Sequence, residues 1–130
     1  MNLDNAIHAC KLAFEASYAP YSKYHVGAAL VCKNGKIYTG CNIENHGIMA
    51  ICAERVAFTK AISEREKDFD YIVVCGGKDL NNLENCLPCG YCRQFMSEFV
   101  DTNFKVYALG PNNEITPYSM NDLLPNNFSL

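Results

Sequence analysis

Hydrophobic and polar positions along the chain follow two different periods, and the change of period divides the sequence into elements. The first segment has the spacing of an amphipathic helix, with hydrophobic residues at Leu3, Ala6, Ile7, Cys10, Ala13 and Phe14. This pattern ends at Ala19-Pro20. Two short hydrophobic runs follow, at 26–32 and 36–42, and they flank Asn34-Gly35, a dipeptide that strongly signals a tight hairpin turn. The N-terminal part therefore predicts a helix followed by an antiparallel β-hairpin.

The rest of the chain alternates between helical and extended patterns. From the hydrophobic spacing we expect a helix over 52–63, a buried strand over 70–75, a helix over 88–100, a strand over 104–109 and a short helix over 119–124. Strands that alternate with helices imply parallel crossover connections after the hairpin. The pattern thus predicts an α/β fold, in which a mixed sheet is covered by helices and residues 1–130 form one domain.

Composition narrows the class of protein. The chain has 130 residues, of which 49% are hydrophobic and 19% charged, the size and balance of a compact domain. A net charge of −3 and the absence of a Lys/Arg run give no attraction to nucleic acid. No apolar run reaches the roughly 18 residues of a membrane span, and the N-terminal segment lacks the pattern of a signal peptide. We therefore expect a cytoplasmic protein with neither a nucleic-acid nor a membrane partner.

The eight cysteines raise the question of a disulfide framework. Without a signal peptide, a secreted and oxidised protein is disfavoured. Four cysteines lie inside hydrophobic helix or strand patterns, where a free thiol behaves as a small hydrophobic side chain: Cys10, Cys32, Cys41 and Cys75. We expect reduced thiols.

Three other cysteines have the placement of metal ligands. Cys89 and Cys92 form a CxxC pair at the start of one predicted helix, and Cys52 lies at the start of another. Helix N-termini stabilise thiolates, and three thiolates leave the fourth position of a tetrahedral Zn²⁺ open for water, as in hydrolytic zinc sites. A CxxC pair alone is equally typical of a redox protein. With Cys86 as a fourth ligand, the same cysteines would form a closed structural zinc site.

Two residues next to Cys52 are candidates for the chemistry around such a metal. Glu54 is expected to shuttle a proton from the attacking water to the substrate and then to the leaving group. It could equally be an acidic residue favoured in the first turn of a helix by the macrodipole. Arg55 is expected to hydrogen-bond a thiolate and offset the negative charge of the sulfurs, or else to be an exposed helix residue.

Five segments resemble, in order, the small homotetrameric cytidine deaminase family: APYSKYHVGAAL at 19–30, GCNIEN at 40–45, ICAER at 51–55, PCGYCRQ at 88–94 and DLLP at 122–125. The resemblance implies a three-layer α/β/α fold with a five-stranded mixed sheet. It implies one Zn²⁺ per subunit, held by Cys52, Cys89 and Cys92, with Glu54 as the proton shuttle. The expected reaction is the hydrolytic deamination of cytidine and 2′-deoxycytidine, with release of ammonia, in pyrimidine salvage.

The resemblance also implies a nucleoside site. Asn42 and Glu44 match positions that bind the ribose hydroxyls, and Tyr24 matches an aromatic residue, usually Phe, that lines the base pocket. Phe128 matches a C-terminal aromatic residue that reaches the site of a neighbouring subunit. From the residue types alone, the two aromatic residues would be assigned to packing and the two polar residues to loops.

Two features depart from the family pattern. The segment 46–51 is one residue shorter than usual and lacks the common aromatic residue, and Tyr91 replaces a residue that is usually small. Blasticidin-S deaminase shares the zinc chemistry and also has a shortened segment, so a modified cytosine nucleoside is the alternative substrate. The intact Asn-Ile-Glu-Asn motif favours an ordinary ribose. His46 is expected to be a solvated loop residue, with an extra metal ligand or a base in the pocket as the alternative, and His25 is expected to be structural.

Overall fold

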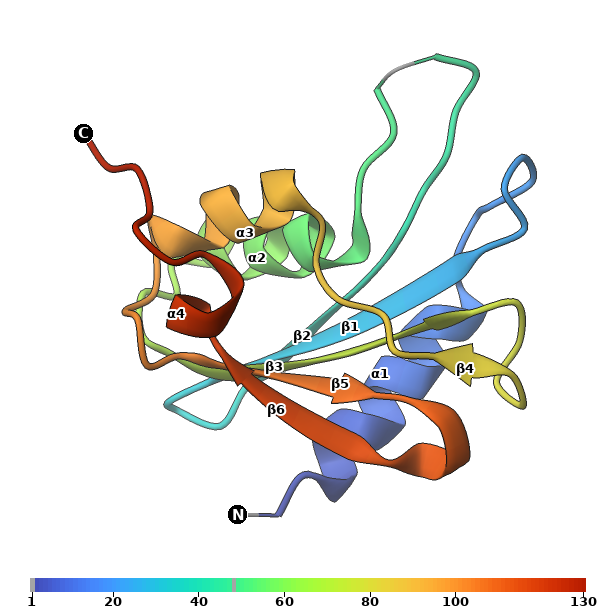
Figure 1. Ribbon diagram of the computed structural model, residues 1–130, viewed down its shortest axis with the longest axis horizontal. Coiled ribbons are helices and arrows are strands. Elements are labelled where there is room, and N and C mark those ends of the chain that lie inside the picture. Colours follow the sequence, from blue (N-terminus) through green and yellow to red (C-terminus); the bar gives the residue numbers. More distant parts are fainter. Residues whose placement is uncertain (1, 48) are drawn as a thin grey trace.

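The computed structural model describes residues 2–47 and 49–130. Within these residues, six strands form one sheet in the order β2-β1-β3-β5-β6, with β4 paired to the end of β3 (Figure 1). The strands are β1 (His25–Cys32), β2 (Ile37–Cys41), β3 (Phe69–Gly77), β4 (Leu83–Glu84), β5 (Lys105–Leu109) and β6 (Ile115–Ser119). The helices are α1 (Asp4–Glu15), α2 (Ala53–Ser63), α3 (Gly90–Ser97) and α4 (Met120–Leu123), with a 3₁₀ turn η1 (Pro111–Asn113).

The sheet is mixed, as the sequence predicts. β1 pairs antiparallel with both β2 and β3, and β5 pairs antiparallel with β6. β3 and β5 form a parallel pair, because the chain crosses over between them through α3. β1 lies between β2 and β3 and is antiparallel to both, so β2 and β3 run in the same direction without being paired. The connection between them passes through α2. The predicted mixed α/β fold is confirmed.

Two strands were not located from the sequence. β6 contains Pro117, which cannot donate a ladder hydrogen bond and is therefore confined to positions such as this edge of the sheet. β4 has two residues, too few to show any periodicity. The expected count of five strands matches the main path of the sheet, and β4 is additional.

Hydrophobic residues fill both faces of the sheet, which makes the fold a three-layer sandwich. On one face α1 packs against alternate residues of β1 and β3, in a buried cluster that includes Ala6, Cys10, Phe14, Ala29, Val73 and Cys75. On the other face α2, α3 and α4 cover the intervening residues, in a cluster that includes Ala28, Leu30, Phe58, Ile72, Val74, Met96 and Met120. Because both faces are buried, the central strands appear in the sequence as continuous hydrophobic runs.

A close approach of α2 to β2 places the start of this helix beside the end of the hairpin. A Cβ atom on Gly40 would lie 2.2 Å from the carbonyl oxygen of Ala53, so only glycine fits there. Beyond β2, Ile43 and Ile51 form an antiparallel bridge through two backbone hydrogen bonds of 3.0 and 3.1 Å. The bridge brings the residue after Ile51, which is Cys52, opposite Asn42. Across the described part of the chain, every helix is too short or too polar to cross a membrane.

Candidate metal centre

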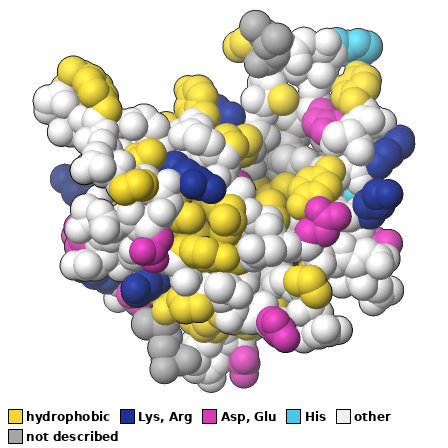
Figure 2. Space-filling view, viewed as in Figure 1, with side chains coloured by type: hydrophobic (Ala, Val, Ile, Leu, Met, Phe, Trp, Pro, Cys, Tyr) yellow, Lys and Arg dark blue, Asp and Glu magenta, His cyan; other side chains and the backbone are white. Residues whose placement is uncertain are grey.

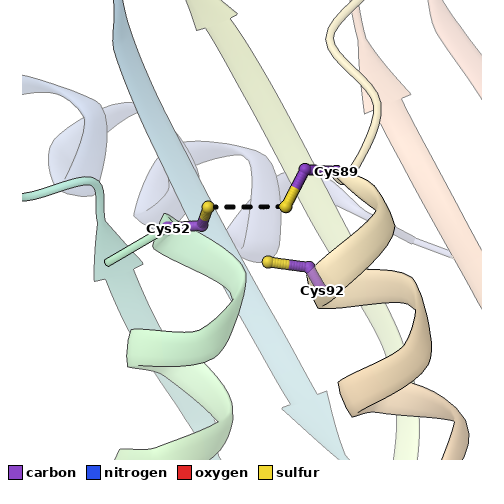
Figure 3. A group of neighbouring side chains, drawn as sticks. All are labelled: Cys52, Cys89 and Cys92. Atoms are coloured by element: carbon purple, nitrogen blue, oxygen red, sulfur yellow. Dashed lines mark hydrogen bonds between the residues drawn. The ribbon is translucent and has the colours of Figure 1, made fainter. Parts of the chain in front are cut away.

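Cys52 and Cys89 are the residues that immediately precede α2 and α3, and Cys92 lies in the first turn of α3. Both N-cap cysteines have extended backbone angles, and neither side chain caps its helix. The two helices begin side by side, and the three sulfur atoms point toward one another (Figure 3). Each helix start contributes unpaired N–H groups and a partial positive charge, which favour thiolates.

The sulfur geometry fits a tetrahedral Zn²⁺ ion. The Sγ atoms of Cys52 and Cys89 are 3.6 Å apart, and all three sulfurs lie within 4.8 Å of one another. Zn–S bonds near 2.3 Å at tetrahedral angles require S···S separations of about 3.8 Å. Cys92 is buried, Cys52 is partly buried and Cys89 is exposed, so the group extends from the interior to the surface. Three sulfurs leave a fourth tetrahedral position for water or substrate.

The three thiols do not share negative charge equally. Hydrogen bonding from Cys92, then from Arg55 and Cys89, lowers the pKa of Cys52, although burial opposes the shift. The hydrogen bond to Cys52, followed by burial, raises the pKa of Cys92. Of Cys52 and Cys92, Cys52 is therefore the one that ionises first, and the guanidinium of Arg55 faces it.

Glu54 is 3% exposed, at the second position of α2. Burial raises the pKa of its carboxyl group to about 7, and repulsion from Cys52 acts in the same direction. A glutamate selected only for the helix macrodipole would remain solvated, because that interaction does not offset the cost of burying a charge. Its burial beside the thiolates therefore favours a chemical role over a purely helix-stabilising one.

Arg55 lies between a sulfur and an aromatic ring. Its Nη2 atom donates to Cys52 Sγ at 3.8 Å, and its guanidinium carbon lies 4.0 Å from the ring centroid of Tyr91. The Nε atom is buried and has no hydrogen-bond partner among the described residues. Tyr91, the unusual residue of the CxxC motif, thus covers the outer face of the arginine that contacts the metal group.

Three of the expected nucleoside residues, Tyr24, Asn42 and Glu44, have defined partners in the structure. Asn42 follows β2 opposite Cys52, and the carboxylate of Glu44 accepts hydrogen bonds from the loop at 21–22. The ring of Tyr24 lies close to Cys86: a Cβ atom on Gly76 would be 2.6 Å from Cys86 Sγ and 3.1 Å from Tyr24 Cε2.

Cys86 lies near the metal group without belonging to it. Burial raises the pKa of Cys86 to about 12, and the next largest cause is the negative charge of Glu54. Among the described residues, the group that can hold a metal contains Cys52, Cys89 and Cys92 but not Cys86. Cys86 therefore does not supply the fourth sulfur that a closed structural zinc site of four cysteines requires.

Phe128 and His46 lie away from the metal group. Phe128 is 66% exposed along the outer side of α3, where its carbonyl oxygen accepts a 3.0 Å hydrogen bond from Gln94. His46 is exposed and packs edge-on against Tyr21, with ring centroids 5.7 Å apart. Neither side chain completes the site of its own chain.

Sequence reasoning missed the residues that hold Asn42 and Glu44. Ser22 donates to the Glu44 carboxylate, and Ser17 and His25 extend the hydrogen bonding of Asn42. Ser17 and Asn42 are 25 positions apart, and no spacing rule connects residues of a helix end and a strand end. Only the tertiary structure brings them together.

An open group of three thiols, next to a buried carboxyl group on an α/β/α sandwich, defines the class of zinc-dependent hydrolytic enzymes. Residues 1–108 match the family model described as "Cytidine and deoxycytidylate deaminase zinc-binding region". The chain therefore belongs to the cytidine and deoxycytidylate deaminase family. The family match and the sulfur geometry together confirm the predicted Zn²⁺ cofactor.

Individual relatives agree with this assignment. The chain is 40% identical to the cytidine deaminase of Sporosarcina psychrophila over 99% of its own length and 93% of the relative. A crystal structure of cytidine deaminase from Burkholderia pseudomallei superposes with a TM-score of 0.87 and 37% identity, covering 98% of this chain and all of the other. The blasticidin-S deaminase of Bacillus cereus is 31% identical over 80% of this chain and 76% of the relative.

Proposed function

We propose that this protein catalyses the zinc-dependent hydrolytic deamination of cytidine and 2′-deoxycytidine to uridine and 2′-deoxyuridine, as a step of pyrimidine salvage. The observation that carries the proposal is the open thiolate group beside the buried carboxyl group of Glu54. The names of the two cytidine deaminases that align over almost the whole chain support the choice of substrate.

Zn²⁺ held by Cys52, Cys89 and Cys92 supplies a Lewis acid that makes a water molecule nucleophilic at neutral pH. Glu54 moves the protons. It takes one proton from the water that adds to C4 of cytosine and delivers it to ring nitrogen N3. It then takes the second proton from the oxygen on C4 and gives it to the exocyclic amine. The C4–N bond breaks, ammonia leaves, and a carbonyl forms at C4.

The remaining residues of the chain bind and orient the nucleoside. Asn42 and Glu44 hold the sugar hydroxyls. Asn42 directly follows β2 and lies opposite Cys52, and Glu44 lies two residues further along the chain. Tyr24 lines the base pocket next to Cys86. Arg55 orients and neutralises the Cys52 thiolate through its guanidinium group.

We also propose that residues 1–130 act as one catalytic domain and that four copies assemble. The face in Figure 2 shows hydrophobic side chains gathered around its centre. The exposed hydrophobic residues of the described chain include Met49 at 78%, Phe128 at 66% and Tyr91 at 65%. Exposed hydrophobic surface of this kind favours self-association. In the assembly, Phe128 reaches the site of a neighbouring subunit. Light scattering and the Phe128→Ala variant test this arrangement.

A cytoplasmic location is part of the same proposal. All eight cysteines are free, as expected for thiols in a reducing compartment. On the face in Figure 2, acidic and basic side chains are interspersed, which gives no basic stripe for nucleic acid on that side.

The test is the ultraviolet change when the zinc-loaded protein is mixed with cytidine, measured together with ammonia release, with Glu54→Gln as the blank. We expect both signals from the parent protein. Blasticidin S is assayed in parallel, because one relative bears that specificity in its name. Consumption of blasticidin S alone would show a pocket for a modified nucleoside. Inactivity on both substrates with zinc bound would overturn the proposal.

A further inference from the structure

Three side chains form a continuous chain of hydrogen bonds that ends at Asn42. The Oδ1 atom of Asn42 is 2.5 Å from Ser17 Oγ, and Ser17 Oγ is 2.9 Å from Nδ1 of His25. Ser17 follows the end of α1, and His25 is the first residue of β1. All three side chains are half-buried, and the His25 ring packs 5.7 Å from the buried ring of Phe14.

The direction of every proton in this chain follows from the backbone contacts of Asn42. The backbone N–H of Val26 donates to Oδ1 at 2.9 Å, and Nδ2 donates to the carbonyl oxygen of Tyr24 at 2.8 Å. A flipped amide would place donor against donor and acceptor against acceptor, so the orientation of the Asn42 amide is fixed.

Because the atom facing Ser17 is Oδ1, the direction of the Ser17 hydroxyl proton is also determined. An amide oxygen only accepts hydrogen bonds, so the Ser17 hydroxyl donates to Oδ1. A hydroxyl has one proton, so the contact with His25 has Nδ1–H as the donor and Ser17 Oγ as the acceptor. His25 therefore carries a proton on Nδ1, and the neutral ring leaves Nε2 without one.

These contacts leave the Asn42 side chain with one hydrogen-bonding group that can bind a substrate. Both lone pairs of Oδ1 and one of the two Nδ2 protons are engaged, and the second Nδ2 proton has no partner among the described residues. Glu44 is similar. Its Oε1 accepts from the backbone N–H groups of Tyr21 and Ser22, and its Oε2 accepts from the Ser22 hydroxyl, which leaves one lone pair. One N–H donor and one carboxylate acceptor match a hydroxyl, which accepts and donates at once.

We propose that Ser17 and His25 are positioning residues that hold the Asn42 amide with a single N–H directed at a substrate hydroxyl. The inference rests on the proposed role of Asn42 in binding the sugar. Without the Ser17 hydroxyl, Oδ1 keeps one acceptor position open, and a water molecule or a substrate hydroxyl can donate to it instead of accepting from the Nδ2 proton. Without a donor at position 25, the Ser17 hydroxyl is free to rotate away from Asn42.

The first test is kinetic and uses matched substrates. Ser17→Ala is expected to raise KM for cytidine about two- to tenfold, the effect of one net hydrogen bond, with kcat within about twofold of the parent. For 2′,3′-dideoxycytidine, which lacks the 2′- and 3′-hydroxyls, the same variant should show no change in KM. In the Asn42→Ala background, Ser17→Ala should add nothing. Ser97→Ala, on the outside of α3, is the matched control. An unchanged KM for cytidine, or an equal rise for both substrates, would overturn the inference.

Position 25 offers a conservative rescue. Asn carries an N–H donor on Cγ, where Nδ1 is attached in His, whereas Leu carries methyl groups there. We expect His25→Leu to reproduce the KM effect of Ser17→Ala and His25→Asn to restore most of the affinity for cytidine. His8→Leu, an exposed position on α1, is the control. Equal behaviour of the two His25 variants would show that the ring acts only by packing.

A second readout does not depend on turnover. In the neutral ring of His25, ¹⁵N chemical shifts should show the proton on Nδ1 in the parent protein, with the preference for this nitrogen weakened in Ser17→Ala. A proton found on Nε2 would overturn the hydrogen-bond direction. If the parent fails to deaminate cytidine while the Nδ1 proton is found, the proposed function fails and the hydrogen-bond network stands.

Discussion

The guanidinium of Arg55 offers the sharpest test of how the metal group is stabilised. It donates to Cys52 Sγ at 3.8 Å, and its outer face lies 4.0 Å from the Tyr91 ring. Arg55→Gln removes the charge and keeps a side chain of similar polarity. A hydrogen bond to a charged group contributes about 1.5–3 kcal/mol, and the long contact to sulfur places this one at the lower end. We therefore expect Arg55→Gln to weaken Zn²⁺ affinity about tenfold, since 1.4 kcal/mol corresponds to a factor of about ten.

The stability of the metal-free protein should behave differently. The buried Nε of Arg55 has no partner in the described part of the chain, and a buried unsatisfied donor costs about 1–3 kcal/mol. Arg55→Gln removes this cost together with the hydrogen bond to Cys52 and the contact with Tyr91, so the opposing effects should leave the Tm of the metal-free protein nearly unchanged while zinc affinity falls. Arg55→Lys keeps the charge but not the planar group that stacks on Tyr91, so its zinc affinity should be intermediate.

Competition with a chromophoric chelator measures the Zn²⁺ affinities, and differential scanning calorimetry measures the Tm of the metal-free forms. Lys60→Gln is the matched control, because Lys60 lies at the far end of the same helix and contacts the carbonyl oxygen of Thr39. Zinc affinities of Arg55→Gln and the parent within twofold of each other would refute a role for Arg55 at the metal. A loss of affinity matched by an equal loss in Lys60→Gln would show a general effect of charge.

Three further variants test other parts of the site and fold. Glu54→Gln should keep the fold and the zinc content but reduce turnover at least ~10²-fold, as measured by ammonia release; near-parental activity would remove the proton shuttle. Tyr91→Leu should weaken zinc affinity about two- to fivefold because the aromatic ring no longer contacts Arg55, and Tyr91→Phe should leave the affinity unchanged. Equal zinc affinities of the two variants would show that the ring does not stabilise the metal group through Arg55. Gly27→Ala should destabilise the protein by about 1–3 kcal/mol in urea unfolding, because the new Cβ would lie 2.4 Å from the backbone of α1. Gly47→Ala is the control, because a Cβ there would have nothing within 4 Å. Equal urea midpoints of the two variants would contradict the close packing of Gly27 against α1.

The sequence predicts those parts of the fold in which a local pattern and a buried face coincide. The helix that became α1 and the hairpin around Asn34-Gly35 have clear periods and turn residues, and the structure shows both. β6 could not be located because none of its residues is fully buried, its two exposed residues are adjacent (Thr116 and Pro117), and one of them is a proline. An edge strand is stabilised mainly by hydrogen bonds to the adjacent strand, here β5, and less by a buried hydrophobic face. This pairing becomes visible only in the folded structure.

The same distinction holds in the site. The metal-binding cysteines could be predicted because ligand spacing and helix starts are local properties. The sequence favours a contact of Arg55 with a thiolate but leaves an exposed residue as the alternative, and the hydrogen bond to Cys52 in the structure decides for the contact. The contact of Ser17 with Asn42 depends on the docking of α1 against β1, which no segment of the sequence specifies alone.

The bridge between Ile43 and Ile51 decides how the shortened segment 46–51 should be interpreted. Two backbone hydrogen bonds close the loop at its base, so Asn42 and Cys52 are held opposite each other from outside the loop. A residue lost between the bridged positions shortens the loop without moving the metal ligand relative to the end of β2. Glu44 is fixed independently, because its carboxylate binds the loop at 21–22 and its N–H donates to the carbonyl oxygen of Tyr18. We therefore expect any effect of the shortened segment on substrate range to come from the side chains of the loop, and not from a displacement of Cys52, Asn42 or Glu44.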